Sequence, residues 1–296
     1  MRLVAPLLAA LLLLSSPGAL GWVAGWDRPH HADLAVKAAR RLPPEWRDLI
    51  LAHEDAFRKG ALDPDGVTDA SKEVNSFFHT YQPGSGGGGG LYRVQASLHD
   101  ATMAKRDGKT DEGIAYQMGF LTHFVADLAM PFHTAPGAYG NEWHLSFERD
   151  AYDHRGEYAI SAGAPPHEIT DVKTYTIHEA EASAALAPGL VKSLDASQGA
   201  WTPEARDIAK RAADLAVDSI ADMLFTAFAQ ADPSRPEPTF TATPPAVREP
   251  EDIGLPPGAA LARHAVAVGA AAVGAFALVA LVVMANRHRR KGRREG

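Results

Sequence analysis

One stretch, residues 120–150, constrains the fold more than any other part of the chain. It reads FLTHFVADLAMPFHTAPGAYGNEWHLSFERD and combines apolar residues at helical spacing with imidazole and carboxylate groups. His123 and Asp127 lie four residues apart, and so do His144 and Glu148. On a helix this spacing brings both side chains of a pair onto one face, about 6 Å apart at Cβ. The stretch therefore predicts two helices whose inward faces carry ionisable groups.

A single pair of this kind on a helix is more often an ion pair or a cap than a metal site. Here His133 follows a Met-Pro-Phe turn between the two pairs, and His31 and His79 lie upstream. Taken alone, His31 is better explained as a hydrogen-bonded core histidine. Buried charges, however, must be paired or bound to metal, and zinc accepts imidazole and carboxylate ligands. The chain has no cysteine, so the set predicts a site for more than one metal ion held by His, Asp and Glu.

The rest of the chain predicts an all-α fold, a compact multi-helix bundle around this site, because no apolar alternation of period two occurs. A helix from Thr110 or Asp111 should lead into the opening stretch, and Pro131 should end it. The glycine run near residue 88 contains G-x-G-x-x-G, but no strand precedes it, so we interpret it as a loop. The other expected helices cover residues 27–42, 70–81, 91–106, 177–194 and 203–231, the last of them with Thr202 as its cap. A loop is expected over 60–69.

Both ends of the chain resemble targeting segments. Residues 1–25 resemble a secretory signal peptide, with an apolar run after Arg2. Ala265–Met284 has no charged residue, and at about 1.5 Å per residue it is long enough to cross the roughly 30 Å core of a bilayer. The basic tail at 285–296 would stay in the cytoplasm. We therefore expect an exported body, a proline-rich linker over 233–258, and a C-terminal transmembrane anchor.

The charge distribution separates the tail from the body. The formal net charge is −7 for the whole chain, and the tail is strongly basic. The body is therefore more acidic than the total suggests. This argues against a protein that binds nucleic acid by bulk electrostatic attraction.

The pattern H-x3-D-x5-H-x10-H-x3-E resembles the zinc-dependent phospholipase C family, which includes the single-strand-specific zinc nucleases. The resemblance covers residues 26–232 and matches nine metal ligands, residue by residue: Trp26, His31, Asp65, His79, His123, Asp127, His133, His144 and Glu148. The family's first ligand is an N-terminal tryptophan, so signal cleavage after Gly25 would create it at Trp26. Trp22 is the alternative, and Asp63 is the alternative to Asp65.

The resemblance implies three zinc ions. Asp65, His79, His123 and Asp127 would hold one, Trp26, His31 and the shared Asp127 a second, and His133, His144 and Glu148 the third. It also implies that a water activated by zinc attacks a phosphodiester. Asp65 is the candidate general base, unless its role is confined to ligation.

Three functions are compatible with such a site. The first is a phospholipase C that cleaves the glycerol-side phosphoester, which a membrane anchor would favour. The aromatic residues of choline-specific members are replaced by Gly66 and Ser76, so the headgroup is open. The second is a zinc nuclease or nucleotidase, with base stacking on Tyr81, Tyr92, Tyr139 and Trp143. The third is a membrane-tethered zinc-binding protein without catalysis. The oligomeric state is not predicted.

Overall fold

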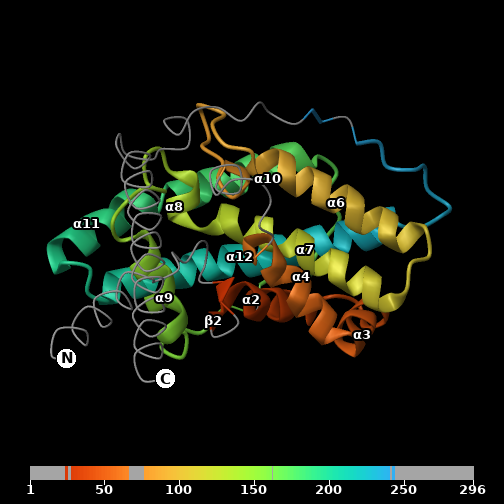
Figure 1. The fold of residues 1–296 in the computed structure, drawn as a ribbon, viewed down its shortest axis with the longest axis horizontal. Coiled ribbons are helices and arrows are strands. Elements are labelled where there is room, and N and C mark those ends of the chain that lie inside the picture. The colour runs from red at the N-terminus through yellow and green to blue at the C-terminus, as the bar shows by residue number, and fades with distance from the viewer. Residues whose placement is uncertain (1–23, 26–27, 67–76, 162, 241, 244–296) are drawn as a thin grey trace, which may run out of the picture. The chain divides into compact units, whose positions relative to one another are not determined.

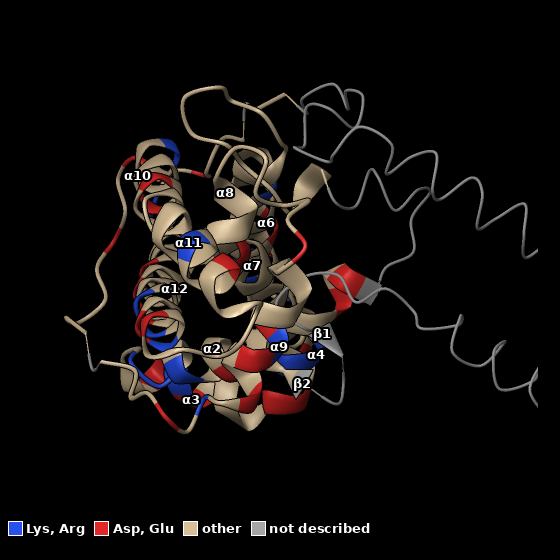
Figure 2. Cartoon of the chain, turned by 90° about the vertical axis from the view of Figure 1, so that its left-hand side faces the viewer, with Lys and Arg blue, Asp and Glu red and all other residues tan. Residues whose placement is uncertain are grey.

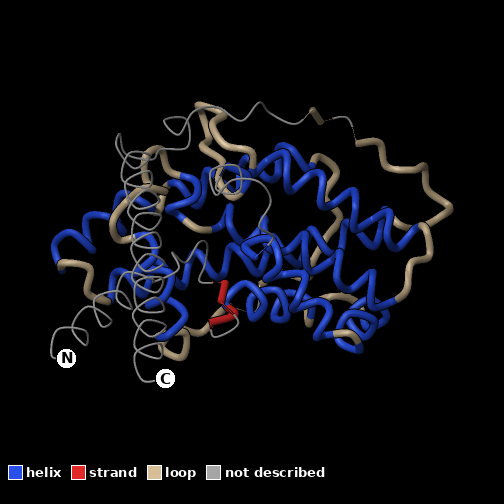
Figure 3. The backbone as a smooth tube through the Cα atoms, in the orientation of Figure 1, coloured by secondary structure: helices blue, strands red, loops and turns tan. Residues whose placement is uncertain are grey.

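The computed structural model describes residues 24–25, 28–66, 77–161, 163–240 and 242–243, which form a predominantly helical fold (Figure 3). Two short strands, β1 (Ala24–Gly25) and β2 (Arg28–Pro29), pair antiparallel. The helices are α2 (His30–Ala39), α3 (Pro44–Ala52), α4 (Glu54–Gly66), α6 (Gly90–Arg106), α7 (Asp111–Ala129), α8 (Pro131–Thr134), α9 (His144–Asp153), α10 (Val172–Ala184), α11 (Ala187–Ser197) and α12 (Pro203–Gln230). Apart from the one short ladder, the all-α expectation is confirmed for the described residues.

Helix α7 forms the centre of the bundle (Figure 1), because α2, α4, α6, α10 and α12 all pack against it. Residues 121–130 are buried without interruption. A helix buried on all sides is normally apolar all round, yet this one carries His123 and Asp127, which are 0% and 1% exposed. The core is thus built around two ionisable side chains that need partners.

Helices α4 and α7 approach closely because glycines stand where they cross. A Cβ on Gly60 of α4 would collide with the Tyr116 carbonyl, and a Cβ on Gly119 of α7 would collide with the Phe57 carbonyl. The two backbones are therefore in direct contact. This contact fixes the separation between the α4 and α7 residues that lie further along the same faces.

The end of α4 differs from the sequence prediction. The sequence predicts a loop over Gly60–Asp69, but α4 continues to Gly66 despite Pro64 in its last turn. Proline removes one backbone donor and usually ends a helix, and the direct packing against α7 offsets that loss. Asp65 consequently stands in a helical turn rather than in a loop.

Side-chain caps begin two of the long helices as predicted. Thr110 Oγ1 accepts a hydrogen bond from the Gly113 N–H at 3.2 Å, and Thr202 Oγ1 accepts one from the Ala205 N–H at 3.1 Å. Both satisfy a donor that the first helical turn leaves free. The caps fix where α7 and α12 start.

The single helix expected over 177–194 is instead two helices, α10 and α11. Helix α10 begins earlier, at Val172, where the Asp171 carboxylate accepts the Thr174 N–H at 3.0 Å. Pro188 lies in the first turn of α11. Proline is tolerated there and not in a helix interior, so it explains why α10 does not run on.

The predicted linker begins on the body of the protein. Residues 232–240 and 242–243, which we call the strap, follow α12 and run back along α6 (Figure 1). Most of them are exposed, as a linker should be, but the strap is held in place by contacts described below.

Outside the core, charges of both signs are mixed. Figure 2 shows acidic and basic residues interspersed along α10 and α12. No helix among the described residues is both long and apolar enough to span a bilayer. Of the predicted signal segment only Ala24 and Gly25 are described, as β1. Ala265–Met284 lies outside the described residues, and the domain boundaries stay predictions.

Candidate metal centre

The Asp127 carboxylate lies at the centre of four imidazoles. Its Oδ2 is 2.6 Å from His79 Nδ1 and 3.3 Å from His123 Nε2. Its Oδ1 is 3.3 Å from His133 Nδ1 and 3.5 Å from His31 Nε2. These side chains come from α2, α7, α8 and the segment before α6. The fold thus brings together five of the residues that the sequence singled out.

Backbone carbonyls fix the tautomer of three histidines. The Nδ1 atom of each lies 2.8–2.9 Å from a carbonyl oxygen and donates to it: His123 to Ala61, His133 to His79, and His144 to Tyr139. A histidine that donates through Nδ1 keeps an unprotonated Nε2 in its neutral form, as metal-binding histidines do. Each of the three therefore presents a lone pair to the interior.

The third predicted ligand group is complete. His133 Nε2 and His144 Nε2 face each other at 3.1 Å, and Glu148 Oε1 lies 3.2 and 2.8 Å from them. Asn141 orients the start of α9, since its Oδ1 accepts the Trp143 N–H at 2.8 Å. Two imidazole lone pairs and a carboxylate converge at one point, which suits a cation.

A second group contains Asp65, His79 and His123. Asp65 Oδ1 lies 3.6 Å from His79 Nδ1 and 3.5 Å from His123 Nε2, and the two imidazole nitrogens are 3.1 Å apart. Asp63, the alternative from the sequence, instead accepts the Tyr116 hydroxyl at 3.0 Å and pairs with Lys59. The geometry therefore brings Asp65 into the centre and leaves Asp63 outside it.

A further group joins His31 to His123 and Asp127. The two imidazoles stack with their centroids 4.1 Å apart. Neither ring nitrogen of His31 has a hydrogen-bond partner, so the interpretation of His31 as a hydrogen-bonded core residue is wrong. Trp26, the predicted partner at this position, lies outside the described residues.

The residues present fit divalent cations. Several buried donor atoms of the centre have no hydrogen-bond partner: both carboxylate oxygens of Asp65, Oδ1 of Asp127, Oε2 of Glu148 and both nitrogens of His31. Buried polar atoms are nearly always satisfied. All of these atoms are nitrogen or oxygen ligands that zinc accepts, so a metal at each group would satisfy most of them, including one of the two ring nitrogens of His31.

The electrostatics of the centre lead to the same conclusion. Burial alone would raise the pKa of Asp127, but His123, His79 and His133 hold it well below its usual value. Burial alone would lower the pKa of His123, but Asp65 and Asp127 raise it well above its usual value. The carboxylates thus require positive charge at the ring nitrogens, and a divalent cation would supply it.

Two residues near the centre were not among the predicted ligands. The Tyr139 ring lies 5.2 Å from the His133 ring and 4.8 Å from the His144 ring, and its carbonyl orients His144. A main-chain acceptor leaves no signal in the sequence. His30 is 2% exposed, and burial lowers its pKa to about 3, so it stays neutral beside His31. In the sequence, only its position next to His31 indicates that His30 lies near the centre.

Comparison with known proteins shows the fold. No protein-family model and no curated protein matches the chain. The alpha toxin from Clostridium absonum is similar over 69% of this chain and 64% of its own, with a TM-score of 0.57 and 15% identity. The Clostridium perfringens alpha-toxin from avian strain SWCP is similar over 69% and 63%, with a TM-score of 0.50 and 15% identity.

The chain therefore spans slightly less than two thirds of the length of these toxins. At this level of identity the likeness establishes a common fold. It supports the resemblance to the zinc-dependent phospholipase C family that the ligand motifs indicate.

Proposed function

We propose that this protein is a zinc-dependent phosphodiester hydrolase, and that its substrate is a phospholipid cleaved at the glycerol-side phosphoester. The observation that carries the proposal is the convergence of buried, unsatisfied donor atoms into three groups on a fold shared with clostridial alpha-toxins. Three zinc ions would use all of the predicted ligands, with Trp26 completing the His31 group.

The residues of the centre have separable roles in this proposal. Zinc bound by the three groups would activate water and neutralise the charge of a phosphate. Asp127 stands between the His31 and His79 sides and would tie two of the groups together. Neither oxygen of Asp65 has a hydrogen-bond partner, so one can ligate zinc while the other accepts the proton of the attacking water as a general base.

Two features favour a phospholipid over a nucleic acid. The surface charges of the described residues are mixed rather than basic (Figure 2). The Tyr81 and Tyr139 residues, considered as stacking platforms, are each only 8% exposed. Rings that are buried to this extent offer little face to a base.

The proposal includes an exported, membrane-anchored protein, with Ala265–Met284 as the anchor. That placement would bring the centre near its lipid substrate. Cleavage after Gly25 would free the Trp26 amine as a ligand. N-terminal sequencing of the exported protein tests this step, and a start at Trp22 would contradict it.

A direct comparison of substrates tests the reaction. The zinc-loaded full-length protein is incubated with phospholipid vesicles of varied headgroup, single-stranded DNA and RNA, and the phosphorylated products are quantified. We expect release of a phosphorylated headgroup from vesicles. Hydrolysis confined to nucleic acid would favour the nuclease, and no hydrolysis would favour a zinc-binding protein without catalysis.

A matched pair of variants tests whether Asp65 is required for hydrolysis. Asp65→Asn should abolish hydrolysis, whereas Asp63→Asn, two residues away and outside the groups, should retain most of it. Elemental analysis of each variant then counts the zinc. Equal activity of the two variants would refute the role of Asp65.

A further inference from the structure

The strap is fastened to the bundle at both of its described ends. Arg106, at the end of α6, donates to the carbonyls of Asp232 at 3.4 Å, Arg235 at 2.9 Å and Pro236 at 3.4 Å. At the other end, the Phe240 ring lies 5.6 Å from the rings of both Tyr92 and His99 on α6. Held in this way, the strap can form one side of a cavity against α6.

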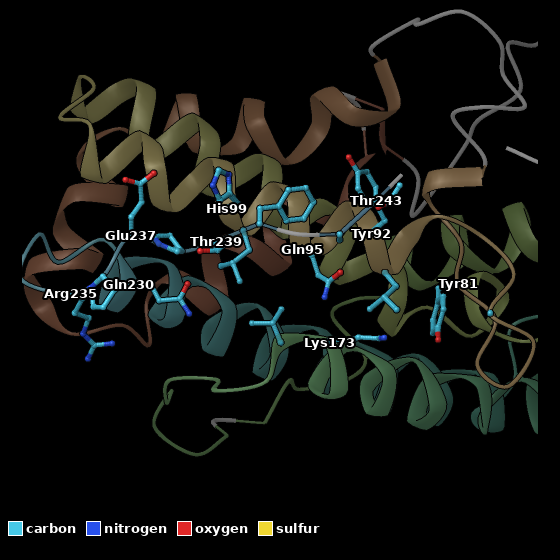
Figure 4. A pocket seen from close by; sticks show the side chains of 18 of the residues that line it. Tyr81, Tyr92, Gln95, His99, Lys173, Gln230, Arg235, Glu237, Thr239 and Thr243 are labelled. Carbon is cyan, nitrogen blue, oxygen red and sulfur yellow. The ribbon is translucent and has the colours of Figure 1, made fainter. Parts of the chain in front are cut away.

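The strap and the bundle border a partly open cavity of about 840 Å³ (Figure 4). This volume is within the range of pockets that hold small ligands. Much of its lining is apolar or aromatic: Tyr81, Leu91, Tyr92, Leu98, Val172 and Phe240. The cavity is elongated along α6, from Arg235 at one end to Tyr81 at the other (Figure 4). Such a shape suits a long, narrow, apolar ligand.

The polar groups of the cavity are unevenly placed. Lys173 and Gln95 lie between its two ends (Figure 4), and Lys173 makes no ion pair within the described residues. The Arg235 guanidinium is paired with Glu168, and the Glu237 carboxylate lies at the end away from Tyr81 (Figure 4). Lys173 is therefore the cation free to receive an anionic group.

One end of the cavity adjoins the metal centre through the main chain. The Tyr81 N–H donates to the His133 carbonyl at 3.1 Å, and Tyr81 lines the cavity. A ligand in the cavity would therefore lie beside the segment that carries His79 and against which His133 packs. None of the proposed metal ligands lines this cavity.

We propose that this cavity binds a single-chain amphiphile with an anionic head, its alkyl chain lying along α6 under the strap and its head on Lys173. The site is separate from the metal centre, and its occupation requires no hydrolysis. A fatty acid has this chemistry, and so does a lysolipid with a phosphate head.

A fluorescent label on the strap tests binding. The chain has no cysteine, so Thr239→Cys, at an exposed position that lines the cavity, accepts one environment-sensitive dye. Labelled full-length protein in lipid nanodiscs is titrated with lauric acid, with lauroyl lysophosphatidate and with neutral dodecyl maltoside. The same dye on exposed Glu204→Cys reports nonspecific partition of each amphiphile into the nanodisc.

We expect a saturable response to both anions at Thr239→Cys and none at Glu204→Cys. Lys173→Glu should weaken binding of the anions about tenfold, since it removes an attraction and adds a repulsion, whereas Lys109→Glu, another exposed lysine, should not. Arg106→Ala should also weaken binding because it loosens the strap, with Arg149→Ala as its control.

Two results would overturn the proposal. One is a response that never saturates or that is the same at both dye positions. The other is equal affinity for the neutral and the anionic amphiphiles, or for Lys173→Glu and Lys109→Glu. Because no readout depends on turnover, these results are distinguishable from a failure of the proposed hydrolase activity.

Discussion

Glu179, on the inner face of α10, should make the protein less stable as the pH rises. Its side chain is buried, the residue being 4% exposed, and neither carboxylate oxygen has a hydrogen-bond partner of normal geometry. Burial raises its pKa well above 4.5, and the nearby Asp222 adds to this, while Ser219 opposes it in part. The Tyr175 hydroxyl donates a hydrogen bond to Asp222 Oδ2 at 2.9 Å. The folded protein therefore keeps a proton on Glu179 that the unfolded chain releases.

The size of the effect follows from proton linkage. Above pH 4.5 the unfolded chain loses the proton and the folded protein retains it, so the free energy of unfolding falls by about 1.4 kcal/mol for each pH unit. The fall stops where Glu179 ionises in the folded protein. Below pH 4.5 both states are protonated and the contribution of Glu179 is constant.

Substitution by glutamine should remove this dependence, because the amide has nearly the same shape and does not ionise. Urea unfolding of zinc-saturated full-length protein, followed by far-UV circular dichroism at several pH values, gives the difference between Glu179→Gln and the parent. This difference should be small at pH 4.5, grow with pH in favour of the variant, and then level off. Glu181→Gln, exposed on the same helix, is the control.

A difference that is constant across pH would refute the reasoning, and so would a parent that gains stability over Glu179→Gln as the pH rises. Because Glu179 is not among the proposed metal ligands, pH effects on zinc binding are common to both proteins and cancel. The control variant should show a difference close to zero throughout.

Three other predictions concern the centre and its frame. Asp127→Asn should abolish phosphodiester hydrolysis while the helical circular dichroism persists; retained activity would contradict the shared role of Asp127. Gly119→Ala should lower the free energy of unfolding by about 1–3 kcal/mol, since the new methyl group meets the Phe57 carbonyl; chemical denaturation measures this, and an unchanged midpoint would show that α4 and α7 can separate freely. Thr202→Ala should lower the free energy of unfolding by about 1 kcal/mol, because it removes the side-chain cap of α12. Thr202→Ser keeps a capping hydroxyl and should unfold at nearly the same denaturant concentration as the parent.

The sequence was most informative where local rules govern the structure. Thr110 and Thr202 were recognised as caps because the capping bond is made within one turn. The His123/Asp127 and His144/Glu148 pairs were placed correctly on their helices because helical spacing alone determines which face they share. Their convergence across the bundle was expected from the family resemblance, and the structure brings the described members of that set together.

Tertiary contacts decided the rest. The Asp-Pro-Asp-Gly segment has turn chemistry, yet α4 continues through Pro64 because α7 packs directly against it. The linker was expected to be solvated because it is rich in proline and acids. Its first part is held by Arg106, whose three backbone acceptors have no side-chain signature. Tyr139 orients His144 through its backbone carbonyl. Every residue has a backbone carbonyl, so the sequence does not indicate this role.

The glycine contact between α4 and α7 has a consequence for how such a protein can evolve. Two backbones that touch set the spacing between Asp65 and His123 without relying on the size of any core side chain. Apolar residues elsewhere in the core are then free to be exchanged as long as the volume is filled. The donor geometry can in this way persist while the apolar residues that surround it are exchanged.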